Sequence, residues 1–182
     1  TDRLAARTPT PGGGSAAAAA GALGAALGEM VLAYSLDPQR PDAELEGVRS
    51  ELERARRRFL ELVGEDAASY ERVRAARRAR KAQPADPATE SAWRAALRGA
   101  AEVPLGTARL AHEGATRLRT VQPRTKTALA SDLVTAQAMF RAAVAGALAN
   151  VEINLADLRA AGEPIDALER ELAALRAGSG GT

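Results

Sequence analysis

The chain has 182 residues, of which 46% are hydrophobic but only 3% aromatic, so one domain with a core of alanine, leucine and valine is expected. Its 25 basic and 23 acidic residues nearly balance, which argues against nucleic acid as the main partner. The absence of cysteine excludes disulfides and thiolate chemistry, and the single histidine, His112, argues against a histidine-bound metal or a Ser-His-Asp triad.

Apolar residues recur at helical spacing along the chain, and no run shows the sustained alternation of a strand. The first helix should run from about Ala16 to Leu36 and end at Asp37-Pro38, because proline cannot continue it. A second should start near Pro41-Asp42 and continue to about Lys81. The remaining helices should begin near Asp86-Pro87, at Ser131 or Asp132, and at Glu163-Pro164.

These elements predict an all-α fold, a single-domain bundle of about five to six helices over residues 1–182, with residues 178–182 as a frayed tail. Pro104 lies inside a helix and should kink it. The segment Ala16–Tyr34 is apolar over nearly a membrane-spanning length, but it consists largely of alanine and glycine and contains Glu29. We interpret it as a buried helix, expect no membrane partner and, with no secretory signal visible, expect a cytoplasmic protein.

A glycine-rich loop, Thr8-Pro-Thr-Pro-Gly-Gly-Gly-Ser15, leads directly into the first helix. Three glycines let backbone pass where side chains cannot fit, and Ser15 is placed to cap the helix. The free N–H groups at the helix start favour an anionic or carbonyl-rich ligand over the loop. The alternative is an ordinary flexible turn.

A few polar residues lie among apolar neighbours, and each has a structural alternative to a chemical role. Asp132 follows Ser131 at a helix start, where it can be a plain N-cap. Asn150 and Asn154 share one helix face, where two amides can bind a heterocycle or cross-link helices. Asp66 either is buried or starts a further helix.

The basic cluster between Arg72 and Lys81 has few acidic neighbours. No aromatic stacking platform accompanies it, so a solvated helix face is favoured over a nucleic-acid surface. A docking patch for an acidic ligand tail remains an open alternative.

Four blocks of the chain resemble the family of methenyltetrahydrofolate cyclohydrolases and the cyclodeaminase domain of formiminotransferase-cyclodeaminase. They are, in order, Pro9-Thr-Pro-Gly-Gly-Gly-Ser-Ala-Ala-Ala18, Glu65-Asp-Ala-Ala-Ser-Tyr70, Val103-Pro-Leu105, and Ser131-Asp132 followed by Ala147-Leu-Ala-Asn-Val-Glu-Ile-Asn-Leu155. The resemblance implies an all-helical homodimer that binds tetrahydrofolate one-carbon derivatives. Family members hydrolyse 5,10-methenyltetrahydrofolate to the 10-formyl form or expel ammonia from 5-formiminotetrahydrofolate.

Both reactions suggest roles for particular residues. A carboxylate can deprotonate the attacking water and stabilise the amidinium-like cation, and Asp132 is our first candidate for it, with Asp66 as the second. Asn150 and Asn154 would orient the pterin, and Arg77 or Arg78 would suit the anionic glutamate tail. The resemblance also implies that the substrate site includes Ser131, Pro11, Gly12, Gly13, Gly14 and Ser15. It implies no metal at this site.

Two segments depart from the family's pattern. Where the family commonly has an Ile-Gly-Lys-Lys-Lys segment, this chain has Leu36-Asp-Pro-Gln-Arg40, and where the family often has Gly-Asn-x-Asn it has Thr125-Lys-Thr-Ala128. Arg40 can replace charge but cannot donate a proton at neutral pH. We therefore expect Lys126 to compensate as a third catalytic residue in the cavity of Asp132 and Asp66, or else to be an exposed loop lysine.

The sequence thus leaves three functions open. A cyclohydrolase is favoured, since this chain contains no formiminotransferase domain. A cyclodeaminase acting beside a separate transferase is the second function, and a non-catalytic folate-binding or structural dimer with a drifted site is the third.

Overall fold

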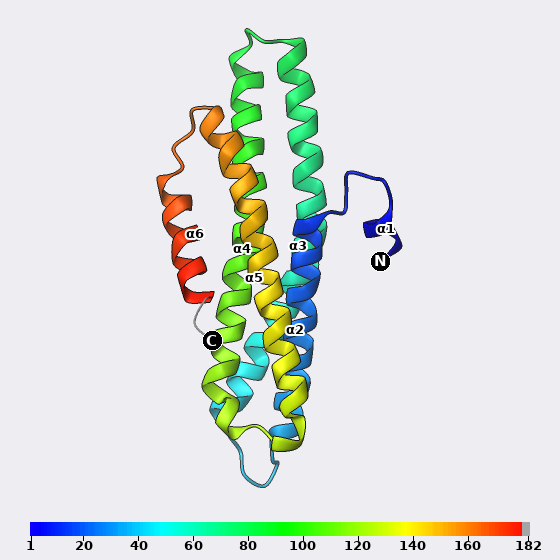
Figure 1. Ribbon diagram of the computed structural model, residues 1–182, viewed down its shortest axis with the longest axis vertical. Coiled ribbons are helices and arrows are strands. Elements are labelled where there is room, and N and C mark those ends of the chain that lie inside the picture. The colour runs from blue at the N-terminus through cyan, green and yellow to red at the C-terminus, as the bar shows by residue number, and fades with distance from the viewer. Residues whose placement is uncertain (180–182) are drawn as a thin grey trace.

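The computed structural model describes residues 1–179 and shows a bundle of four long antiparallel helices (Figure 1). The helices are α2 (Gly13–Ser35), α3 (Ala43–Ala82), α4 (Pro87–Val121) and α5 (Ala130–Ala160). Each packs against its neighbours in sequence, and α5 closes the ring by packing along α2. Residues 1–179 contain no strand, which confirms the predicted all-α fold.

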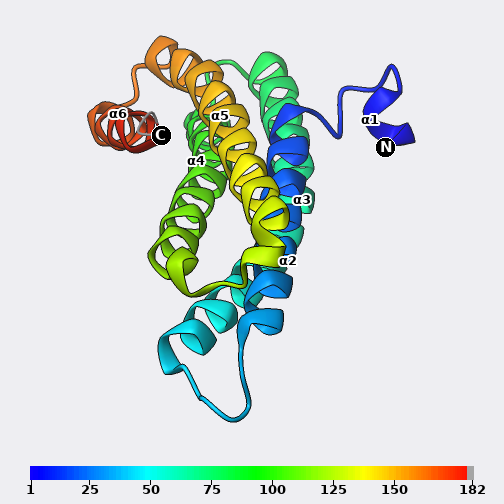
Figure 2. The same cartoon turned by 60° about the horizontal axis from the view of Figure 1, so that its bottom comes forward.

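Two shorter helices lie outside the bundle, one on either side of it (Figure 2). These are α1 (Asp2–Ala5), of which no residue is buried, and α6 (Asp166–Ser179), which packs on α4 and α5. The chain turns from α4 into α5 through two 3-10 turns, Gln122–Arg124 and Thr127–Leu129.

Side-chain caps explain where two of the long helices begin. The carboxylate of Asp42 accepts hydrogen bonds from the backbone N–H groups of Glu44 and Leu45, at 3.1 and 3.0 Å. Asp86 accepts one from Ala88 N–H, and Pro87 fills the first helical position, where no N–H is needed. These are the starts that the proline positions predicted.

Two boundary predictions need correction. The fifth helix begins at Ala130, after a 3-10 turn, so neither Ser131 nor Asp132 caps it. Gly178 and Ser179 still belong to α6, so the tail does not start at residue 178, and residues 180–182 lie outside the described residues. Pro104 lies inside α4, as predicted.

Glycines of α2 let large side chains of other helices enter the core. A Cβ on Gly21 would overlap the ring of Phe59, and one on Gly28 would lie 2.8 Å from Leu52. The rings of Phe59 and Phe140 meet at 6.4 Å between centroids. These glycines therefore let the helices pack closely inside the chain.

The helix α2 is long and apolar enough to cross a membrane by length and composition alone. Half of its most apolar window, however, is buried inside the molecule. Its composition is that of a helix packed on both sides by α3 and α5.

The long helices differ in length, and this difference creates space at one end. The helix α2 has 23 residues, whereas α3 has 40, α4 has 35 and α5 has 31. In Figure 1, α2 begins about midway along the molecule while α3 and α4 continue upward. One corner of the bundle is therefore missing beyond Gly13, where the glycine loop enters.

Candidate functional site

A pocket of about 370 Å³ lies where α2 begins. Its walls come from four parts of the chain: Pro9, Thr10, Gly12, Gly13 and Gly14 of the loop; Asp66, Ser69, Tyr70, Val73, Arg74 and Arg77 of α3; Ala100 of α4; and Asn150, Ile153, Asn154 and Asp157 of α5. The glycine loop, Asp66 and the two asparagines, which the sequence analysis selected separately, thus meet in one place.

Asp66 is one of two carboxylates that line this pocket, the other being Asp157, and Ser15 and Gly14 position Asp66. The Ser15 hydroxyl donates a hydrogen bond to Asp66 Oδ2 at 2.7 Å and lies 3.2 Å from the carbonyl of Val63. A Cβ on Gly14 would overlap Asp66 Oδ1, so only glycine lets the carboxylate rest against the start of α2. The local backbone therefore requires glycine at this step of the loop.

Ser15 does not cap α2, contrary to the prediction. The helix already begins at Gly13, and Ser15 lies within its first turn with its side chain facing α3. It is 2% exposed, behind Asp66. Ser15 and Pro11 are not on the pocket wall, and Ser15 acts on the pocket through the carboxylate.

Asn150 stands opposite the glycine loop. Its Nδ2 would lie 3.2 Å from a Cβ on Gly13, and it donates a hydrogen bond to the carbonyl of Gly146 at 2.8 Å. A bare backbone at residue 13 leaves room for this amide at the pocket wall.

Asn154 replaces a backbone hydrogen bond that Pro104 removes from the neighbouring helix, α4. Pro104 has no N–H, so the carbonyl of Ala100, four residues earlier, loses its helical partner. Asn154 Nδ2 donates to this carbonyl at 2.7 Å and also to the carbonyl of Asn150 at 3.0 Å. The Val103-Pro104-Leu105 block and Asn154 are therefore parts of one structural unit. Of the two roles considered for Asn154, its amide nitrogen has the structural one, which is to link two helices.

Basic and aromatic side chains of α3 form the outer wall of the pocket. Arg74 lies 5.9 Å from the ring centroid of Tyr70, and Arg77 lies 5.8 Å from that of Trp93. Arg74 and Arg77 line the pocket, whereas Arg78 does not. The wall thus presents two guanidinium groups, with Asp157 of α5 also lining the pocket.

Glu65, the neighbour of Asp66, has a different environment. Arg58 binds it at 2.5 Å, and this hydrogen bond holds the pKa of Glu65 below its ordinary value of 4.5. Glu65 does not line the pocket. Of these two adjacent acids, only Asp66 lines the pocket.

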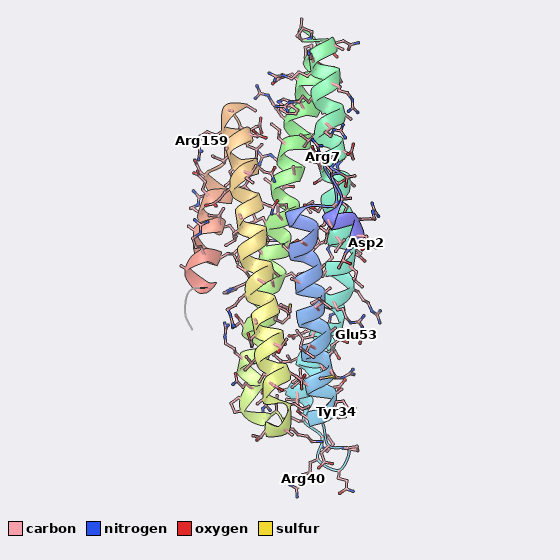
Figure 3. The ribbon with its side chains drawn as sticks, turned by 45° about the vertical axis from the view of Figure 1, so that its right-hand side comes forward. Asp2, Arg7, Tyr34, Arg40, Glu53 and Arg159 are labelled. Atoms are coloured by element: carbon pink, nitrogen blue, oxygen red, sulfur yellow. The ribbon has the colours of Figure 1, made fainter. Side chains whose placement is uncertain are left out.

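The remaining predicted residues lie at the opposite end of the bundle. The helical rise of about 1.5 Å per residue separates Asp132 from Asn150 by roughly 27 Å along α5. Lys126 is exposed beside the end of α2, where its backbone N–H donates to Ser35 Oγ at 3.0 Å. Figure 3 shows Tyr34 and Arg40 at this same end.

The expectation that Lys126, Asp132 and Asp66 share a cavity is therefore wrong for a single chain. Ser131 and Asp132 begin α5 at this end, and both segments that depart from the family's pattern lie here as well. The catalytic roles of Asp132 and Lys126 stay predictions.

Several pocket residues were missed by the sequence analysis although a signal existed. Tyr70 and Val73 follow Asp66 at helical spacing, so they had to share its face of α3 with Arg77, which the sequence had already suggested for the glutamate tail. Ile153 and Asp157 relate in the same way to Asn150 and Asn154 on α5. Extending each motif by one helical turn would have found them.

Fold and pocket define an all-helical bundle with a polar, glycine-walled site at one end. A sequence model of the formiminotransferase-cyclodeaminase family matches residues 1–173, and the chain belongs to this family.

Two other proteins are similar to this chain over most of its length. The chain is 32% identical over 157 residues to a methenyltetrahydrofolate cyclohydrolase of Methylorubrum extorquens, covering 84% of this chain and 76% of the relative. A crystal structure of formiminotetrahydrofolate cyclodeaminase from Thermotoga maritima superposes with a TM-score of 0.82 at 27% identity, covering 98% of this chain and 86% of the other.

Proposed function

We propose that this protein is a tetrahydrofolate one-carbon enzyme that hydrolyses 5,10-methenyltetrahydrofolate to 10-formyltetrahydrofolate. Its family and its cyclohydrolase relative support the substrate class. The observation that carries the reaction is the Asp66 carboxylate, held by Ser15 in a pocket lined by amide and guanidinium groups.

The chemistry needs one group to move a proton twice. Water adds to the cationic methenyl carbon, and Asp66 takes the proton that this water releases, giving a neutral tetrahedral intermediate. The bond from this carbon to N5 then breaks as the protonated Asp66 returns its proton to N5. The hydroxyl group of the intermediate loses its own proton to solvent as its oxygen forms the carbonyl, which leaves the formyl group on N10 and releases one proton overall. The negative charge of Asp66 also stabilises the cation before attack.

The other groups of the pocket fit the remaining parts of a folate. The side-chain oxygens of Asn150 and Asn154, together with the second N–H of the Asn150 amide, suit the donor and acceptor edge of the pterin. Arg74 and Arg77 suit the carboxylates of the glutamate tail, as expected for Arg77 from the sequence.

The direct test follows the absorbance of 5,10-methenyltetrahydrofolate with purified protein. We expect the rate to rise with protein concentration above the spontaneous hydrolysis, and 10-formyltetrahydrofolate to be the product. A rate equal to that of buffer, with folate binding retained, would support the non-catalytic alternative instead.

The structural match to a cyclodeaminase favours a second candidate reaction, ammonia release from 5-formiminotetrahydrofolate. The same pocket and carboxylate would serve it. Ammonia production from the formimino substrate, at a rate exceeding methenyl hydrolysis, would select this activity over the first.

We also propose that the protein is a cytoplasmic homodimer. The outward faces of α2 and α5 expose large apolar side chains, with Leu23 at 61% and Ile153 at 67%. Light scattering at micromolar concentration should give twice the chain mass of 18.9 kDa.

A further inference from the structure

Two guanidinium groups line the pocket on the side of α3, which continues beside α4 beyond the start of α2 (Figure 1). They belong to Arg74 and Arg77, and their surroundings differ. Arg74 is already paired, because it donates a hydrogen bond to Glu71 at 3.1 Å. Within residues 1–179, Arg77 has no carboxylate within ion-pair distance and lies instead over the ring of Trp93. Of these two groups, Arg77 is therefore the one free to bind an anion.

Trp93 contacts Arg77 without lining the pocket itself. It is the single tryptophan of the chain, lies in the second turn of α4 and is 7% exposed. The guanidinium carbons of both Arg77 and Arg80 lie 5.8 Å from the centroid of its ring. Arg80 is paired with Glu90 at 2.5 Å, so the ring holds one arginine whose charge is offset and one whose charge is not.

Contact with an aromatic ring prepares an arginine for a carboxylate. A guanidinium group over a ring uses its face for this contact and keeps its edge N–H groups, of which a carboxylate accepts two side by side. Arg77 is exposed, and binding a ligand would otherwise have to restrict its many rotamers at a cost in entropy. Trp93 restricts them before the ligand arrives, so it favours binding at Arg77 without touching the ligand.

The position of Arg77 along α3 matches the length of a folate. Its Cα lies roughly 17 Å beyond that of Asp66 along the helix axis. In an extended folate the far carboxylate of the glutamate lies roughly 12 Å from the methenyl carbon, at about 1.3–1.5 Å per bond. Helical side chains lean toward the N-terminal end of their helix, which is the direction of Asp66, so the long side chain of Arg77 covers the difference.

We infer that Trp93 is a positioning residue for the substrate, which holds Arg77 so that its guanidinium group binds a carboxylate of the glutamate tail. The identity of this ligand rests on the proposed function. The inference assigns tail recognition to Arg77 more than to Arg74, whose charge Glu71 already offsets. The reacting end of the substrate, at Asp66, is then bound independently of Trp93.

Binding of a stable folate with and without its glutamate tests this assignment and needs no turnover. The two ligands are 5-formyltetrahydrofolate and 5-formyltetrahydropteroate, which lacks the glutamate, and calorimetric titration gives the Kd of each. Arg77→Gln should raise the Kd of the first roughly tenfold, the scale of one hydrogen bond to a charged group, and leave that of the second unchanged. Arg78→Gln is the matched control, because it removes the same charge from a neighbouring residue outside the pocket and should change neither Kd.

Variants of Trp93 test its role as a positioning residue. Trp93→Leu should raise the Kd of the glutamate-bearing ligand roughly two- to fivefold and leave that of the glutamate-free ligand unchanged. Trp93→Phe keeps a ring beside Arg77 and should restore most of the affinity. In an Arg77→Gln background, Trp93→Leu should have no further effect. A merely structural role of the ring would weaken both ligands alike and would persist in that background.

Equal losses for both ligands in Trp93→Leu, or an unchanged Kd for 5-formyltetrahydrofolate in Arg77→Gln, would overturn the inference. If Trp93→Leu does not fold, the surface change Arg77→Lys decides, since it keeps the charge but removes the flat group that lies on the ring. It should weaken the glutamate-bearing ligand alone, and wild-type affinity would overturn the inference. A wild-type protein that binds neither ligand would refute the proposed function as well, whereas equal affinity for the two ligands would refute this inference alone.

Discussion

At the scale of residues, the pocket depends on glycines that leave room for polar side chains of other helices. Gly14 is the clearest case, because its missing Cβ is the space that the Asp66 carboxylate occupies. The substitution Gly14→Ala should lower the free energy of unfolding by roughly 1–3 kcal/mol, as overpacking does, and displace Asp66 from Ser15.

Gly47→Ala is the matched control, since a Cβ there meets nothing within 4 Å. It should stabilise α3 by roughly 0.5–1 kcal/mol. In an Asp66→Ala background the cost of Gly14→Ala should largely vanish, as measured by urea unfolding. An undiminished cost would mean that the clash lies elsewhere.

Pro104 and Asn154 allow a second test at this scale. Asn154→Leu leaves the carbonyl of Ala100 without its donor and should cost about 1–3 kcal/mol of stability. In a Pro104→Ala background the alanine N–H can reach that carbonyl, so the same change should cost about 1 kcal/mol less. Equal costs in the two backgrounds would contradict the coupling.

Single residues show where sequence reasoning stops. The loop pattern predicted that the backbone comes close to another group, but it did not identify that group. The structure shows that it is Asp66, which contacts both Gly14 and Ser15 and lies 51 residues after Ser15 in the sequence. Such pairings depend on helix rotation and register, which local patterns do not determine. The caps at Asp42 and Asp86 are local, and they follow from the sequence.

At the scale of elements, ion pairs hold the segment before α6 against α4. Glu163 binds Arg98 at 2.9 Å and Arg94 at 3.2 Å, and it is mostly covered, with 17% of its side chain exposed. The hydrogen bond from Arg98 is the main reason why the pKa of Glu163 is lower than its ordinary value of 4.5.

A lowered folded-state pKa adds stability that is present above pH 4.5 and is lost as the pH falls through the folded value. The substitution Glu163→Gln should therefore lower Tm at pH 7 and have a much smaller effect near pH 3. Thermal melts at both values measure this. A Tm difference that stays constant with pH would show that the carboxylate charge is not responsible.

Helix periodicity predicted the elements well because burial of one apolar stripe imposes it directly. The same periodicity also indicates that one continuous helix joins Ser131 to Asn154. Such a helix cannot place Asp132 beside Asn150 in one chain. The α1 helix was not predicted, and its residues, none of which is buried, give no apolar period.

At the scale of the whole molecule, the site results from unequal helix lengths. Because α2 begins only at Gly13, short of the neighbouring helix ends, three longer helices surround a space that the glycine loop closes from one side. The same bundle has the pocket at one end and Lys126 and Asp132 at the other. One chain therefore builds both the bundle and the pocket, while the segments that depart from the family's pattern lie at the end of the bundle away from the pocket.

The central claim is that Asp66 drives hydrolysis in this pocket, and two adjacent acids allow its most direct test. Asp66→Asn removes the pocket carboxylate, whereas Glu65→Gln makes the same charge change outside the pocket, at a residue paired with Arg58. Turnover of 5,10-methenyltetrahydrofolate should fall by roughly a hundredfold or more in Asp66→Asn, the scale of general acid–base catalysis, and change little in Glu65→Gln. Equal turnover in Asp66→Asn and the wild type, with both proteins folded, would contradict the account.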